Sequence, residues 1–412
     1  MKKKLSFFIA MAIIMVGCSN DASLKKRAYE LAHTYIITDG HIDVPWRLND
    51  GYEDLSVRTE GGDFDYIRAK EGGLDVPFMS IYVPSSYQET GGAKEKADSL
   101  IDLVHRISND HPDKFEVAYS PNDGDRIFSQ GKIALPMGME NGAPIEDDLN
   151  NVAYFHKRGI RYITLTHARD NLICDSSYDT TNTWGGLSPF GRQVVAEMNR
   201  VGIMVDISHV TDAVINQVLD MAKAPVIASH SSCRKFTPGW QRNMGDPEIK
   251  RLKENGGVIQ INYGSSFVTQ ASQDKRQANT DKVAAYAKKN GLEQGDEQLK
   301  VYAKKVSKDN PIYADITEVI DHIDHVVKLA GIDHVGIGSD YDGVGDSLPY
   351  GLKDVSSYPN LIYHLLKRGY SDEDIANIAE KLGIKNGLFR VRQVDLKLTL
   401  KDNRFGEIGR AS

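Results

Sequence analysis

Eight short apolar runs, separated by polar or helical sequence, limit the fold more than any other feature of this chain. They are rich in β-branched residues, and near-continuous apolar runs suit strands buried on both faces, as in parallel sheets. The runs are "YIITDGH" from Tyr35, "DVPFMSIYV" from Asp75, "KIALPMGME" from Lys132, "RYITLTH" from Arg161, "GIMVDISH" from Gly202, "APVIASH" from Ala224, "GGVIQINY" from Gly256 and "HVGIGSDYD" from His334. Helical patterns lie between them, with Ser188 and Thr211 as N-caps. Strand alternating with helix eight times predicts an α/β fold, a (β/α)₈ TIM barrel.

The alternative arrangement of such elements is a doubly wound sheet. No glycine-rich phosphate turn follows the first predicted strand, so the barrel is favoured. The composition, 41% hydrophobic and 26% charged residues, is typical of a folded globular protein. A net charge of -7 argues against a nucleic-acid partner, which would need a basic face.

Polar residues gather at the C-terminal ends of the predicted strands. In a barrel these ends form one rim, so residues far apart in sequence meet there. A single histidine at a strand end is usually a satisfied core or rim residue, but five runs that each end in a histidine or carboxylate indicate a site. The residues are His41, Asp43, Glu140, His167, His209, His230, Tyr263 and Asp340.

The tripeptide "HID" occurs twice and is expected to behave differently in its two places. The first copy follows an apolar run, and on a strand His41 and Asp43 share one face. The second copy lies among apolar residues at helical spacing, where positions i and i+2 are about 200° apart. His322 and Asp324 therefore face different directions, and only the first copy is predicted to hold a metal ion.

The strand ends supply three imidazoles and two carboxylates, a mixture that suits zinc or a similar ion. Five ligands are too many for one tetrahedral ion with an open position, but they suit two ions that share a carboxylate. Glu140 is the candidate shared ligand. His41 and Asp43 are assigned to one ion, and His209 and His230 to the other.

The first residues read as a targeting signal. "MKKKLSFFIAMAIIMVGCSN" has three lysines, a short apolar run and a small residue before Cys18, and it resembles a bacterial lipoprotein signal. We expect residues 1–17 to be the signal peptide, Cys18 to carry the lipid and residues 18–30 to form a tether. The protein would then be exported and anchored to a bacterial membrane, on the periplasmic or cell-surface side, by its lipid alone. An ordinary secretory peptide is the alternative.

The sequence does not decide whether the two further cysteines, Cys174 and Cys233, form a disulfide. Export permits a disulfide, but two buried free thiols are equally compatible with the spacing. The barrel domain is expected over residues 31–395, with a polar insertion near 270–310 and a C-terminal tail over 396–412.

Several stretches, in order along the chain from about Ile36 to Arg390, resemble the membrane (renal) dipeptidase family of zinc peptidases. They are "DGHIDVP", "EGGLDVPFMSIYVP", "GMENG", "ITLTHARDN", "GLSPFGRQVVAEMNRVGIMVDISHV", "VIASHSS", "QRNM", "GIGSDYDG" and "GLKDVSSYPNLIYHLLKRGYSDEDIANI". The resemblance implies a metal-dependent hydrolase barrel with two zinc ions per chain. It also implies dipeptide substrates and tolerance of a D-residue at the C-terminal position. The resemblance is compatible with a homodimer but does not require one.

Carried over residue by residue, the family's metal ligands fall on the five residues already chosen. They are His41, Asp43, Glu140, His209 and His230. The family's substrate contacts fall on His167, Arg242 and Asp340. The chain departs from the family in the loop "CRKFTPGW", whose length could shift Arg242, and in "KLGIKNGLFRV", which matches loosely around Asn386. The polar stretch from Gln270 to Asn310 is enlarged and could shape the mouth of the site.

These residues predict a mechanism. A hydroxide bridging the two ions, with Glu140 holding both, would attack the peptide carbonyl. His167 would donate to the developing oxyanion, and Asp340 would hold the water or pass its proton to the leaving amine. Arg242 would pair with the free carboxylate of the dipeptide.

Two other functions remain open from the sequence. Another binuclear-metal barrel hydrolase could act on cyclic amides, lactones or phosphotriesters, although many such sites bridge through a lysine-derived ligand and no predicted strand here ends in lysine. A non-catalytic peptide-binding lipoprotein would not need every ligand and both auxiliary polar groups.

Overall fold

Eight parallel strands close into a barrel in the order β1-β10-β9-β8-β7-β6-β5-β2. The computed structural model describes residues 21–380. One barrel strand comes from each of the eight apolar runs, which confirms the predicted barrel. The strands are β1 (Ile37–Ile42), β2 (Leu74–Tyr82), β5 (Met137–Glu140), β6 (Ile160–Thr164), β7 (Met204–Asp206), β8 (Ile227–Ser231), β9 (Val258–Ile261) and β10 (Val335–Ile337).

The third apolar run forms two strands instead of one. Its first half, β4 (Ile133–Leu135), pairs with β3 (Phe115–Val117) in a separate two-stranded sheet, and only its second half, β5, enters the barrel. Pro136 stands between the halves. It has no N–H to donate to a ladder, while its carbonyl accepts a hydrogen bond from the Met79 N–H at 2.8 Å. The proline therefore marks where one continuous apolar run changes sheets.

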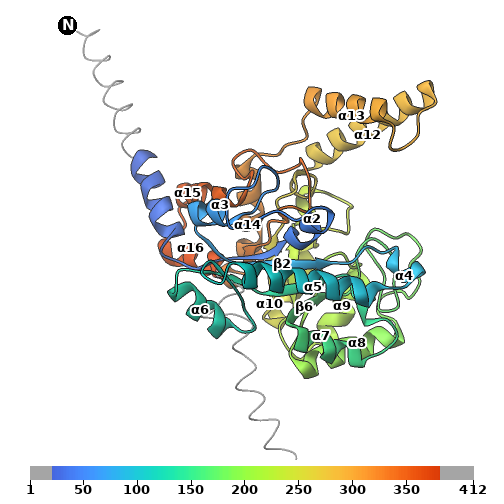
Figure 1. Ribbon diagram of the computed structural model, residues 1–412, viewed down its shortest axis with the longest axis horizontal. Coiled ribbons are helices and arrows are strands. Elements are labelled where there is room, and N and C mark those ends of the chain that lie inside the picture. Colours follow the sequence, from blue (N-terminus) through green and yellow to red (C-terminus); the bar gives the residue numbers. More distant parts are fainter. Residues whose placement is uncertain (1–20, 381–412) are drawn as a thin grey trace, which may run out of the picture.

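Helices surround the barrel and form most of the connections between its strands (Figure 1). The α-helices are α2 (Val44–Asp50), α3 (Tyr66–Gly72), α4 (Tyr87–Thr90), α5 (Ala93–Asp110), α6 (Pro121–Ser129), α7 (Asn150–Arg158), α8 (Pro189–Val201), α9 (Asp212–Met221), α10 (Asp246–Asn255), α11 (Ser265–Val268), α12 (Gln270–Asn290), α13 (Glu297–Asp309), α14 (Ile316–Leu329), α15 (Tyr358–Arg368) and α16 (Asp372–Ala379). Short 3₁₀ turns are η1 (Ala143–Ile145), η2 (Arg234–Phe236), η3 (Ile332–His334) and η4 (Val355–Ser357). Ser188 and Thr211 cap α8 and α9 by accepting from the N–H groups of Gly191 and Val214, as predicted.

A layer of large side chains fills the barrel interior beneath the rim. It contains Phe78, Tyr162, Met204, Ile227 and Val258, one from each of five strands. Gly138 on β5 makes room for this layer, because a Cβ there would lie 1.9 Å from the Tyr162 ring.

Residues 21–32 form a helix that packs on the body of the protein. Ala28 and Leu31 are buried in the main hydrophobic core. The folded domain thus begins before the predicted boundary at residue 31, and the described part of the expected tether is helical. The expected signal peptide, Cys18, Asn386 and the C-terminal tail lie outside the described residues. Within residues 21–380, no helix has the length and apolarity required to cross a bilayer.

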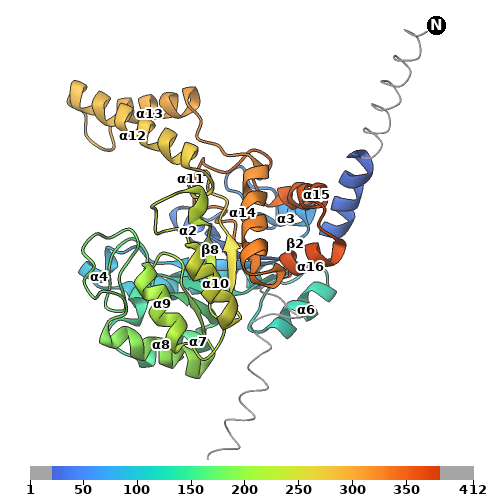
Figure 2. The same cartoon turned by 180° about the vertical axis from the view of Figure 1, so that it is seen from behind.

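The polar stretch 270–310 folds into two helices, α12 and α13, which extend together away from the barrel (Figures 1 and 2). The base of this hairpin adjoins α11. The two remaining cysteines, Cys174 and Cys233, are free and buried, so they do not pair with each other.

Candidate metal centre

The five predicted metal ligands converge at the C-terminal rim of the barrel. Each side chain belongs to a residue that is at most 5% exposed. The ligands come from β1 and the residue after it, from β5, from the turn after β7, and from β8; they are His41, Asp43, Glu140, His209 and His230.

The register of the sheet explains this convergence. Tyr82 pairs with Glu140, Glu140 with Thr164 and Thr164 with Asp206, so the ends of β2, β5, β6 and β7 lie in one row. Parallel strands in a barrel direct these ends to the same face. Polar residues that follow the row, such as His209, therefore reach the same space as Glu140.

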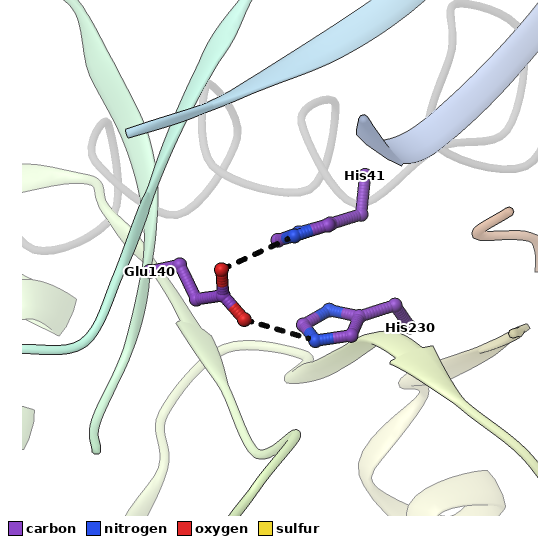
Figure 3. A group of neighbouring side chains, drawn as sticks. All are labelled: His41, Glu140 and His230. Carbon is purple, nitrogen blue, oxygen red and sulfur yellow. Dashed lines mark ion pairs between the residues drawn. The ribbon is translucent and has the colours of Figure 1, made fainter. Parts of the chain in front are cut away.

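The Glu140 carboxylate lies between the imidazoles of His41 and His230 (Figure 3), and His209 approaches it as well. Its Oε1 is 3.1 Å from the Nε2 of His209 and 3.2 Å from the Nε2 of His230. Its Oε2 is 3.5 Å from the Nε2 of His41. The two oxygens thus face different histidines, which is the arrangement a carboxylate needs to hold two cations at once.

Two further carboxylates, those of Asp43 and Asp340, stand beside His41. The Oδ2 of Asp43 is 3.5 Å from the His41 Nε2, and His41, Asp43 and Asp340 form one group whose potential ligand atoms lie within 4.8 Å of one another. Gly343 leaves space for both aspartates, since a Cβ there would lie 2.1 Å from the Oδ2 of Asp43 and 2.4 Å from the Oδ1 of Asp340. Asn262 holds Asp340 by donating to its Oδ2 at 2.7 Å.

His167 also reaches the cluster, from the loop after β6. Its Nε2 is 3.5 Å from the Oε1 of Glu140, and its ring centre is 4.2 Å from that of His209. His167, Glu140 and His209 form a further group with ligand atoms within 4.8 Å of one another. The geometry therefore allows His167 to contact a substrate or an ion, whereas the sequence predicted only the first role.

Charge and burial set the protonation of the central carboxylate and two of its histidines. Burial would raise the pKa of Glu140, but the neighbouring imidazoles hold this pKa well below its usual value. Burial, followed by the charges of Arg242 and His41 respectively, lowers the pKa of His209 and of His230 well below the usual value. An ionised carboxylate and neutral imidazoles are the forms that bind metal ions.

His41 differs from the other two histidines. Burial lowers its pKa, but Tyr162, Asp43 and Glu140 outweigh burial and raise the pKa well above its usual value. A proton on the Nε2 of His41 would occupy the position between carboxylates that a cation would otherwise take. A metal ion and this proton would compete for the same lone pair.

Hydrogen bonds behind the cluster orient two of the imidazoles. The Nδ1 of His41 lies 2.8 Å from the Tyr162 hydroxyl, which donates to the Gly40 carbonyl at 3.1 Å. His41 must then donate through Nδ1, so the lone pair of Nε2 faces the cluster.

A serine and a buried aspartate orient the imidazole of His230 in a similar way. Its Nδ1 lies 2.7 Å from the Ser229 Oγ, which donates to the Asp206 Oδ2 at 2.6 Å. Asp206 is itself held by the Thr164 hydroxyl at 2.5 Å. Tyr162, Asp206 and Ser229 were not predicted as site residues. Asp206 ends β7 and Ser229 precedes a predicted ligand, but neither position alone signals this role.

Several atoms of the cluster lack the partners that buried polar groups need. The Nε2 of His41 and the Oδ1 of Asp43 have no hydrogen-bond partner among the described residues. The Nε2 atoms of His209 and His230 lie 2.8 Å apart, although both also face Glu140. Buried polar atoms are normally satisfied, and a divalent cation would bind these converging lone pairs. The residues therefore fit a site for zinc or a similar ion.

Two residues of the site adopt backbone conformations that are uncommon outside glycine. His209 has a φ of 69° and Asp340 a φ of 63°. Such left-handed conformations carry strain and cluster at functional sites. Here they turn both side chains towards the cluster directly after β7 and β10.

A cavity of about 330 Å³ opens above the cluster. Aromatic and small side chains line it together with the predicted polar residues; the lining is Asp43, Trp46, Tyr82, Glu140, His167, Tyr178, His209, Phe267, Arg276, Asp340, Gly343, Val344 and Ser347. The volume suits a small substrate, and the polar groups stand at the carboxyl ends of the strands.

Arg242 reaches the cluster but not the cavity wall. It is 2% exposed, and it donates to the Ser231 Oγ at 2.8 Å and the His230 carbonyl at 2.9 Å. It also lies 3.0 Å from the Nε2 of His209. Its guanidinium carbon is 5.0 Å from the centre of the Phe267 ring, which does line the cavity. Tyr263, another strand-end residue, packs in the core against Tyr341.

Comparison with known proteins identifies relatives over nearly the whole chain. The profile of the family described as membrane dipeptidase, peptidase family M19, matches residues 25–393. The dipeptidase tcpJ of Claviceps purpurea (strain 20.1) is 34% identical over 354 residues, 82% of this chain and 73% of that protein. Dipeptidase 3 of Mus musculus is 30% identical over 387 residues, 91% of this chain and 68% of that protein.

A solved structure agrees with these sequence matches. The crystal structure of the probable dipeptidase PvdM from Pseudomonas aeruginosa is similar with a TM-score of 0.74 and 29% identity. The similarity covers 87% of this chain and 96% of that chain.

Proposed function

This chain belongs to the membrane dipeptidase family of metallopeptidases and is a hydrolase, and we propose that it cleaves dipeptides with two zinc ions held at the barrel rim. The observation that carries the proposal is the Glu140 carboxylate, whose two oxygens face His41 on one side and His209 with His230 on the other. We also propose tolerance of a D-residue at the C-terminal position, which rests on the family resemblance.

The proposed ligand sets follow the geometry. His41 and Asp43 would hold one ion, His209 and His230 the other, and Glu140 both. When bound, the ions would polarise the scissile carbonyl and lower the pKa of the water that serves as the nucleophile. Each remaining step depends on side chains of this chain.

His167 is placed to stabilise the carbonyl oxygen. It lines the cavity, and burial lowers its pKa, so the ring is neutral and keeps one N–H to donate. A hydrogen bond to the oxygen that gains charge would favour the tetrahedral transition state.

Asp340 is placed to move a proton. Burial, followed by the charge of Asp43, raises the pKa of Asp340 to about 8 in the metal-free site, and a nearby cation would lower it again. With its pKa lowered in this way, Asp340 would be ionised, so it could take a proton from the attacking water and deliver it to the leaving amine. Asn262 keeps the side chain in place during both transfers.

Arg242 remains the proposed partner of the substrate's free carboxylate. Its guanidinium donates to Ser231 and to the His230 carbonyl, but these bonds use two of its five N–H groups, and its Nε has no hydrogen-bond partner among the described residues. Arg242→Ala should raise KM for dipeptides and leave carboxyl-blocked substrates largely unaffected. Equal losses on both kinds of substrate would reject this role.

The function is tested by measuring metal content and product together. Purified protein should hold two zinc ions per chain by elemental analysis and release free amino acids from L-L and L-D dipeptides. His230→Ala should lose one zinc ion and nearly all activity while the fold, followed by circular dichroism, survives. A protein that carries zinc but cleaves lactones or cyclic imides instead of dipeptides would refute the proposal, as would one that cleaves nothing.

We also propose that Cys18 carries a lipid that anchors the protein outside the cytoplasm, as the sequence of the first residues indicates. Cys18→Ala should move the protein from the membrane fraction to the soluble exported fraction. Unchanged fractionation would refute the anchor without affecting the proposed activity.

A further inference from the structure

The α12–α13 hairpin contributes one side chain to the catalytic cavity. Arg276, on the second turn of α12, lines this cavity together with Tyr178 and Phe267. Arg276 also lines a second cavity, of about 640 Å³, between the two helices of the hairpin and the segment that follows them. The guanidinium therefore stands at the boundary between the projecting hairpin and the mouth of the site.

Arg276 has no carboxylate partner among the described residues. Its one close polar contact is the Ser266 Oγ, at a long 3.5 Å. Exposed arginines elsewhere pair with acids: Arg169 with Glu89, and Arg368 with Asp321 and Asp324. An unpaired guanidinium on a cavity wall is available to bind an anionic group of a ligand.

The depth of Arg276 indicates which anionic group it would bind. In a dipeptide, the α-carboxylate is attached one residue from the scissile bond, so it must lie near the metal ligands. Arg242, buried and 3.0 Å from the Nε2 of His209, is the cation at that depth. Arg276 is exposed and belongs to the cavity lining, which Arg242 does not, so it is available to a side chain of the substrate.

We propose that Arg276 forms a subsite for an acidic side chain, so that this enzyme favours dipeptides containing aspartate or glutamate. The inference rests on the proposed dipeptidase function and adds a substrate class to it. Apart from the carboxylates and histidines of the metal cluster, the described lining is mostly aromatic or small, and it contains no second lysine or arginine. Selectivity for the acidic group would therefore depend on one residue.

Isosteric substrates test the proposal. The zinc-loaded protein is first assayed with Ala-Ala; absence of hydrolysis there would contradict the proposed function itself. Arg276→Ala is then compared with the wild type on Ala-Glu against Ala-Gln and on Glu-Ala against Gln-Ala. We expect kcat/KM to fall about tenfold for the Glu peptide in one of these pairs and to change little for the Gln peptides, because a charge-assisted hydrogen bond is lost.

The neighbouring Lys275 supplies a matched control. Lys275→Ala removes the same charge from the same turn of α12, but Lys275 does not line either cavity. It should leave the Glu-to-Gln ratio unchanged, and Arg276→Lys should retain part of the preference. Equal effects of the Arg276 and Lys275 variants, equal losses on Glu and Gln peptides, or no effect of Arg276→Ala would each overturn the proposal. Thermal unfolding of each variant identifies any loss that comes from misfolding.

Discussion

The two "HID" copies of this chain have the same three residues and opposite roles. In the first, His41 at the end of β1 and Asp43 after it lie on one side, with the His41 Nε2 3.5 Å from the Asp43 Oδ2. In the second, on α14, His322 is fully buried while Asp324 lies near the surface and pairs with Arg368. A strand brings positions i and i+2 together and a helix separates them.

The ring nitrogens show a second difference. Both nitrogens of His322 are used by backbone groups: Nδ1 accepts from the Cys233 N–H and Nε2 donates to the Val268 carbonyl, each at 2.9 Å. His41 uses only Nδ1, towards Tyr162, and its Nε2 faces two carboxylates. A buried histidine whose two nitrogens both bond backbone groups, as in His322, has no lone pair left for a metal ion.

Removing each histidine in turn should separate the two roles most strongly. His41→Ala should lower kcat/KM on the order of 10³-fold, because a bound cation contributes several kcal/mol and each ~1.4 kcal/mol is tenfold. His322→Ala should leave the activity per folded, metal-loaded molecule nearly unchanged. The measurement is dipeptide hydrolysis per folded protein molecule, with the zinc content of each variant determined separately. A comparable loss of activity in both variants would mean that the second copy also serves the site.

Stability should respond in the opposite sense. His322→Ala leaves a cavity and two buried backbone groups, the Cys233 N–H and the Val268 carbonyl, without partners. We expect the free energy of unfolding to fall by about 2–5 kcal/mol. Chemical denaturation in a chelator, which removes stabilisation by bound metal, compares His322→Ala with His41→Ala. If His41→Ala lowered the free energy of unfolding more than His322→Ala, the assignment of His322 as the core histidine and His41 as the ligand would be wrong.

The sequence predicted the difference in direction but not the difference in hydrogen bonding. Periodicity is local, so the strand at His41 and the helix at His322 could be inferred from their neighbours. The partners could not, because Tyr162 lies 121 residues from His41, and Cys233 lies 89 residues from His322. Only the closure of the barrel brings such pairs into contact.

Other features show the same limit. The eight strands and the five predicted ligands followed from local patterns and from the rule that strand ends meet at one rim. The change of sheet at Pro136 depended on pairing with β3, which has a short and weak pattern of its own. The depth of Arg242 and the position of Arg276 on the cavity wall depended on how loops fold over the rim.

The hydrogen bond behind His41 provides a smaller test of the same comparison. Tyr162→Phe keeps the ring that fills the barrel interior but removes the hydroxyl that orients the His41 Nδ1. We expect zinc affinity to fall about 10- to 100-fold, the usual effect of losing a group that orients a ligand. Competition with a fluorescent chelator measures it. Unchanged affinity would show that packing alone orients His41.

Of all these substitutions, Asp324→Ala in the second copy should have the smallest effect, whereas Asp43→Ala in the first copy should affect the metal site. Asp43→Ala should reduce zinc binding, because its carboxylate faces His41 and Asp340. Asp324→Ala removes only a partly exposed pair with Arg368 and a hydrogen bond from Tyr370 at 2.8 Å. Partly exposed ion pairs contribute about 0–1 kcal/mol to stability. The free energy of unfolding should therefore fall by no more than that, and the zinc content should stay the same. Loss of zinc in Asp324→Ala would show that α14 positions the rim, and the two copies would then not be independent.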